Sequence, residues 1–149
     1  MDIKDFLAPA DVLVDVRAPD KNRLLADLSR RAAARVGLHE DLVAREILKR
    51  ETLGSTGTGG GIAIPHARFS EIAKPFGLLA RVRKAIAFEA IDGEPVDVVF
   101  LLLLPAAAGS EQLNALASVA RRLRQPEVMA AVRRADDAAA AYEALTGTT

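Results

Sequence analysis

The order of apolar and polar residues along the chain predicts strands that alternate with helices. Residues 11–16, DVLVDV, alternate between apolar and acidic side chains, which is typical of a half-buried strand. A helix is expected next, because Asp20 can cap its start, apolar residues follow at helical spacing, and Gly37 can end it. A second helix is predicted over residues 40–52.

Three apolar segments that follow this helix predict further strands, at residues 61–67, 76–86 and 96–104. The last is apolar at nearly every position beyond Asp97, which suits a central strand covered on both faces. Three more helices are expected after it: one from about Ser110, one from Pro126, and an alanine-rich one that ends near Leu145. This alternation predicts an α/β sandwich.

Composition narrows the function classes. A chain of 149 residues with 50% hydrophobic content predicts one globular domain with its own core. The 20 basic and 20 acidic residues balance, which argues against a nucleic-acid or anionic-membrane binder. There is no cysteine, so no disulfide or thiolate site exists. Since the start lacks a signal peptide's basic and apolar pattern, and residues 98–108 are too short to span a bilayer, a cytoplasmic protein is expected.

Candidate chemistry concentrates in residues 54–69, GSTGTGGGIAIPHARF, which hold five of the ten glycines and one of the two histidines. A nucleotide-binding phosphate loop is rejected, because Gly60 stands where that loop needs lysine. With two histidines and no cysteine, neither a metal site nor a cofactor is predicted. Ser55 lies close in sequence to His66, but the glycine-flanked elbow of serine hydrolases is missing.

The remaining chemistry is nucleophilic attack by His66. A neutral imidazole can attack phosphorus and hold the phosphoryl group, and Pro65 helps to fix the backbone before the ring. Glycine N–H groups can approach an anion closely. Thr56 and Arg50 can add a hydroxyl and a guanidinium as phosphate-binding groups. The alternative is a plain loop that ends in histidine, with Arg50 as a solvated helix charge.

Two other groups of polar residues receive structural interpretations. His39 stands at a helix start and is expected to be structural. Arg81, Arg83 and Lys84 lie on a predicted strand and are expected to form one solvated face, which also suits contact with an acidic partner.

Two long segments resemble a known family. Residues 48–68, LKRETLGSTGTGGGIAIPHAR, look like the active-site region of enzyme IIA domains of the fructose/mannitol type, which belong to the bacterial phosphoenolpyruvate-dependent phosphotransferase system. Residues 85–123, AIAFEAIDGEPVDVVFLLLLPAAAGSEQLNALASVARRL, resemble the second conserved block of that family. The similarity covers about residues 7–145, nearly the whole chain, which it implies as the core of the domain, and it is greatest to the nitrogen-regulatory branch.

The resemblance implies a site and a fold. His66 matches the histidine that is phosphorylated, usually on Nε2, by an HPr-type phosphocarrier that enzyme I charges from phosphoenolpyruvate. Arg50 matches the arginine near the active site. The implied fold is a mixed β-sheet flanked by helices on both faces. Where many members have a second histidine, this chain has Gln112, or Asn114 in an alternative register, and Gln112 is taken as a phosphate-binding residue.

The leading functional hypothesis is a phosphohistidine carrier of the nitrogen-regulatory type, whose phosphorylation state regulates partners such as kinases or transporters. Two alternatives remain open. One is the IIA component of a fructose or mannitol transporter. The other is a binding regulator that no longer needs phosphorylation.

Overall fold

The computed structural model describes residues 2–107 and 110–147, with the side chains of residues 110–113 left outside the description. A six-stranded sheet has the order β1-β5-β6-β3-β2, with β4 also paired to β6. Its strands are β1 (Val12–Val16), β2 (Gly57–Gly59), β3 (Ile62–Ala63), β4 (His66–Phe69), β5 (Phe76–Ile86) and β6 (Val96–Pro105). The sheet is mixed, because β5 runs antiparallel to β6 while β3 and β4 run parallel to it.

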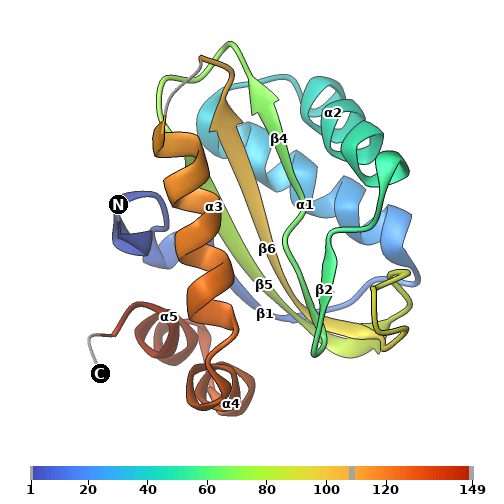
Figure 1. Cartoon of the computed structure of the whole chain (residues 1–149), viewed down its shortest axis with the longest axis vertical. Helices are drawn as coiled ribbons and strands as arrows, with labels where there is room; N and C mark the ends of the chain where they lie inside the picture. Colours follow the sequence, from blue (N-terminus) through green and yellow to red (C-terminus); the bar gives the residue numbers. More distant parts are fainter. Residues whose placement is uncertain (1, 108–109, 148–149) are drawn as a thin grey trace.

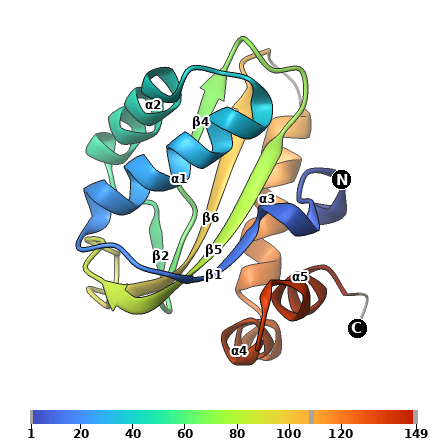
Figure 2. The same ribbon diagram turned by 180° about the vertical axis from the view of Figure 1, so that it is seen from behind.

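Helices cover both faces of this sheet, as the resemblance implied (Figures 1 and 2). One face carries α1 (Lys21–Val36) and α2 (Glu40–Leu53). The other carries α3 (Ser110–Leu123), α4 (Pro126–Arg134) and α5 (Ala138–Thr146). Two short 3₁₀ helices, Ile3–Asp5 and Pro9–Asp11, precede β1. Within the described residues, no helix has both the length and the apolar character needed to cross a bilayer.

The central strand β6 confirms the expectation of burial on both faces. Its even-numbered apolar residues, such as Phe100 and Leu102, pack against α3, α4 and α5. Its odd-numbered ones, such as Leu101 and Leu103, pack in the core under α1 and α2. Because successive side chains of a strand point to opposite faces, continuous apolarity is what a doubly covered strand requires.

The predicted helix boundaries are confirmed by the caps. The Asp20 side chain accepts a hydrogen bond from the N–H of Arg23 at 2.8 Å, and Gly37 ends α1 with φ of 76°. His39 caps α2 through its Nδ1, which accepts from the N–H of Asp41 at 3.1 Å. His39 is therefore structural, as predicted.

The strand predicted over residues 61–67 is in fact two strands. β3 ends at Ala63 and β4 begins at His66, and both pair with β6. Between them, Pro65 has no N–H to donate to a ladder, while its carbonyl accepts from the N–H of Leu102 at 2.9 Å. The sequence pattern also missed β2, which pairs antiparallel with β3. His66 consequently opens a new strand at the point where the sheet is interrupted.

Arg81 corrects the expectation of a solvated basic face. Its Nη1 donates to the carbonyls of Val132, Arg133 and Ala135 at 3.0, 3.3 and 2.7 Å. These carbonyls lie at the end of α4, where the last residues of a helix have no intrahelical partner. Arg81 therefore joins α4 to the sheet.

Candidate active site

His66 lies in a cavity of about 380 Å³ between α2, α3 and the ends of β4 and β6, which we call the His66 cavity. The ring stands at the first residue of β4, opposite Leu102 of β6. Helix α2 borders the cavity on one side, and Leu116 of α3 borders it on the other. The described residues that line it are Glu46, Lys49, Arg50, Leu53, His66, Ala67, Arg68, Leu104 and Leu116.

The His66 ring is held by one nitrogen. Nδ1 lies 2.8 Å from the carbonyl oxygen of Ile64, which can only accept a hydrogen bond. In the neutral ring Nδ1 therefore carries the proton, and Nε2 keeps its lone pair. Among the described residues, no group is hydrogen bonded to Nε2. The arrangement leaves a nucleophilic nitrogen free in the cavity.

The surroundings keep this ring neutral. Burial lowers the pKa of His66 below 6.5, and the positive charges of Arg50 and Arg68 lower it further. The Ile64 carbonyl and the charge of Glu51 act in the opposite direction, and the net shift is downward. A lowered pKa preserves the unprotonated Nε2 that nucleophilic attack needs.

Positively charged side chains line the His66 cavity. The structure brings Arg50 into the His66 cavity, as the sequence predicted, and its Nη1 donates to the carbonyl of Gly54 at 2.9 Å. Lys49 and Arg68, both exposed, line the same cavity and were not singled out from the sequence. A guanidinium has five N–H donors, so the bond to Gly54 leaves others for the oxygens of an anion. The cavity thus combines a neutral nucleophile with positive charge.

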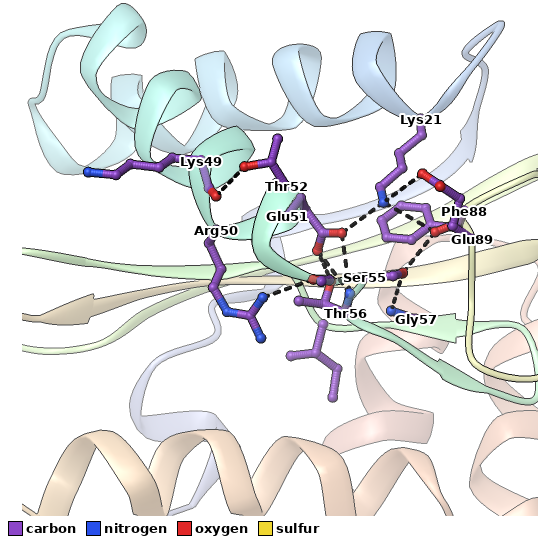
Figure 3. Close-up of polar contacts among 12 residues, drawn as sticks. Lys21, Lys49, Arg50, Glu51, Thr52, Ser55, Thr56, Gly57, Phe88 and Glu89 are labelled. Carbon is purple, nitrogen blue, oxygen red and sulfur yellow. Dashed lines mark hydrogen bonds and ion pairs between the residues drawn. The ribbon is translucent and has the colours of Figure 1, made fainter.

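Thr56 lies beside the site in a buried polar network that Figure 3 shows. Its hydroxyl donates to the Glu51 carboxylate, and its N–H lies 3.2 Å from both carboxylate oxygens. Thr56 is absent from the described lining of the His66 cavity. The Thr56 hydroxyl therefore donates its hydrogen bond to Glu51 and not to a group in the His66 cavity.

Lys21 completes the network from the first residue of α1. Its Nζ lies 2.9 Å from Glu51 Oε2, donates to the carbonyl of Phe88 at 3.2 Å, and stands 4.5 Å from the Phe88 ring centroid (Figure 3). Neither Lys21 nor Glu51 was found from the sequence. A lysine at a helix start and a glutamate near a helix end usually read as solvated charges, so only the fold brings them together.

The glycines take a different place from the one expected. Gly59, Gly60 and Gly61 have φ of 99°, 67° and 79° and form the turn between β2 and β3. The Gly60 N–H donates to Asp92 at 2.9 Å, and its carbonyl accepts from Arg133 at 2.7 Å. The described lining of the His66 cavity contains no glycine. The expected cluster of glycine N–H groups around His66 is wrong, because these glycines supply a tight hairpin turn instead.

The remaining predicted positions lie on α3. The side chain of Gln112 falls outside the described residues, and Asn114, the alternative, is exposed. Gln112 precedes Leu116, which lines the cavity, by one turn of the helix. In the described part of the chain, no group of three or more His, Cys, Asp or Glu side chains is placed to hold a metal ion.

Comparisons with known proteins agree with this geometry. The family model described as "Phosphoenolpyruvate-dependent sugar phosphotransferase system, EIIA 2" matches residues 5–147. The nitrogen regulatory protein of Bradyrhizobium diazoefficiens is 43% identical over 145 residues, covering 97% of this chain and 95% of that protein. The structure of nitrogen regulatory protein IIA-Ntr from Neisseria meningitidis superposes with a TM-score of 0.91 at 30% identity, covering 97% of this chain and 99% of that one.

A more distant structure shares the fold alone. IIA mannitol from Escherichia coli superposes with a TM-score of 0.75 at 18% identity, covering 93% of this chain and 97% of that one. The family match extends over almost the entire sequence and includes the His66 cavity. The chain therefore belongs to the EIIA 2 family of the phosphoenolpyruvate-dependent sugar phosphotransferase system, and this membership implies a role in phosphotransfer.

Proposed function

We propose that the chain is a phosphohistidine carrier of the nitrogen-regulatory type. His66 accepts a phosphoryl group from an HPr-type phosphocarrier protein, and the phosphorylation state regulates partner proteins. The observation that carries this proposal is the His66 ring, with Nδ1 bound to the Ile64 carbonyl at 2.8 Å and Nε2 unbonded among the described residues of a cationic cavity. The regulatory role is supported by the higher identity to nitrogen regulatory proteins than to IIA mannitol.

The transfer follows from the tautomer. Nε2 attacks phosphorus with its lone pair, so that a new N–P bond forms while the N–P bond of the donor histidine breaks. The donor ring, protonated on its other nitrogen, leaves as neutral imidazole. The positive charge passes to the His66 ring, where the Ile64 carbonyl accepts from the N–H at Nδ1. Positioning and electrostatics supply most of the catalysis in such transfers.

The other site residues have separate roles in this proposal. Arg50 donates to the phosphoryl oxygens with the N–H groups that Gly54 does not occupy. Thr56 acts through Glu51 and holds the chain that follows α2. Gln112, or Asn114, donates from α3; this part rests on the sequence similarity.

Reconstitution tests the proposal. The full chain is mixed with enzyme I, an HPr-type carrier and phosphoenolpyruvate, and the product is analysed by intact mass. We expect one phosphoryl group, labile in acid and stable in base, as a phosphoramidate is. His66→Ala should accept none, whereas His39→Ala, which removes the exposed capping histidine, should accept one.

Two results would contradict the assignment. Labelling that persists in His66→Ala, or that maps to Ser55 or Thr56, would show that another group is the acceptor. A wild-type chain that gains no phosphoryl group from a functional donor would favour the binding regulator.

A further inference from the structure

A second basic surface lies at the other end of the sheet. Arg17, Arg83 and Lys84 are exposed and, with Ala18 and Pro19, line a hollow of about 510 Å³, which we call the Arg17 hollow. Arg83 lies six residues beyond Gly77, and Gly77 shares Leu102 of β6 as a pairing partner with His66. At about 3.3 Å per residue of strand, the two sites are about 20 Å apart. The Arg17 hollow is therefore outside the His66 cavity.

The end of β1 brings two arginines to the same hollow. β1 runs parallel to β5 with its last residue, Val16, opposite Val82, and the residues that follow these two, Arg17 and Arg83, both line the Arg17 hollow. The register shifts between Leu13 and Val16, where Asp15 has φ of 58°. A left-handed conformation at a non-glycine residue costs of the order of 1 kcal/mol. Because Arg17 and Arg83 line the same hollow, their like charges repel each other and favour a negative charge bound between them.

The cations of the hollow are unneutralised. None of Arg17, Arg83 and Lys84 has an ion pair or a side-chain hydrogen bond among the described residues. Of the carboxylates next to Arg17 in the chain, Asp20 is occupied by the N–H of Arg23, and Asp15 does not line the hollow. Arg81 and Arg35, in contrast, have internal partners, at the end of α4 and on Asp11 respectively.

From this arrangement we propose that the Arg17 hollow is a docking site for an acidic segment of a partner protein. Carboxylates spaced along an extended segment match the guanidinium groups of Arg17 and Arg83 in one hollow, because a guanidinium binds a carboxylate through paired hydrogen bonds. The rest of the surface argues against nucleic acid, because the chain has a net charge of zero. The docking needs neither His66 nor its phosphorylation, so a partner can occupy this surface while His66 carries a phosphoryl group.

The test uses the full chain and a synthetic octaglutamate peptide as the probe. Titration is followed by the backbone amide NMR signals, at low and at physiological salt. We expect signal changes at residues 17–19, 83 and 84, and a Kd that rises with salt. The double charge reversal Arg17→Glu with Arg83→Glu should weaken binding at least tenfold while leaving the rate of His66 phosphorylation unchanged.

The matched control reverses two charges at the other basic site. Lys49→Glu with Arg68→Glu removes the same charge from the His66 cavity and should change peptide affinity less than twofold. If a reversal lowers the melting temperature, the neutral variant Arg17→Gln with Arg83→Gln and Lys84→Gln replaces it and should also weaken binding. The proposal is overturned if only the control variant weakens binding, or if neither variant does. Equal binding of inorganic phosphate, duplex DNA or phosphatidylserine vesicles at residues 17–19 would likewise overturn it.

Discussion

The two basic hollows of this molecule are built in different ways. In the His66 cavity, Arg50 is held by the Gly54 carbonyl, and its neighbour Glu51 is locked into a buried network with Lys21 and Thr56. In the Arg17 hollow, the described cations have no such support. Groups fixed before a ligand arrives suit chemistry, because little reorganisation is needed at the moment of reaction. Unsupported cations suit docking, where side chains adapt to the partner.

The largest expected effect is on the free energy of unfolding, when the buried network of Glu51, Lys21 and Thr56 beside the His66 cavity is broken. Glu51→Ala leaves Lys21, which is 14% exposed, with only the exposed carboxylate of Glu89 at 3.9 Å, and it leaves the Thr56 hydroxyl without its acceptor. Removing one partner of a buried ion pair typically costs 3 to 5 kcal/mol, and we expect a loss of about 3 kcal/mol in the free energy of unfolding. Urea unfolding followed by circular dichroism measures this difference.

Glu46→Ala is the control for that experiment. Glu46 also lies on α2 and lines the His66 cavity, but its ion pair with Arg45 is at the surface. We expect a loss of at most about 1 kcal/mol. Similar losses for the two variants would mean that the buried network adds nothing to stability. They would contradict the idea that the His66 cavity is built on fixed groups and the Arg17 hollow is not.

A smaller effect is expected from changing the guanidinium alone. Arg50→Lys keeps the positive charge but removes the planar arrangement of donors, so phosphorylation of His66 should slow about tenfold, equivalent to about 1.4 kcal/mol in the barrier. The melting temperature should stay the same, since Arg50 lies at the cavity surface. Quench-flow transfer from the phosphorylated carrier gives the rate. Parallel losses of stability and rate would instead assign Arg50 a structural role.

The smallest expected effect is on the pH dependence of the phosphorylation rate and of stability. Burial, aided by Arg50 and Arg68, lowers the pKa of His66 below 6.5, so the acid limb of the phosphorylation rate should lie below that pH. The unfolded chain binds this proton more readily than the native chain. Stability should therefore fall as pH drops from about 6.5 through the native pKa. NMR titration of the His66 ring measures the shift. A native His66 pKa above 6.5 would contradict the prediction.

The sequence predicted much of the fold because its signals are local. The Asp20 and Gly37 caps, the alternation in β1 and the continuous apolarity of β6 all reflect geometry within a few residues. The sequence similarity also placed Arg50 near His66, within the single segment of residues 48–68, and both residues line the same cavity.

What the sequence missed depends on contacts between distant segments. Lys21 and Glu51 are 30 residues apart, and no periodic pattern marks them as a pair. Arg81 reaches the end of α4 across the sheet, although its strand position suggested a solvated charge. The glycines were assigned to anion binding because glycine suits both a tight turn and close backbone approach, and composition does not distinguish these uses.

The buried carboxylate of Glu51 also bears on how the protein opens. It joins the first turn of α1, the last turn of α2 and the chain entering β2. Local unfolding of any one of them separates a buried charge from its partner, so the segments form a single cooperative unit rather than three independently fraying ends. Because α2 also lines the His66 cavity, we expect the surroundings of His66 to open together with this unit.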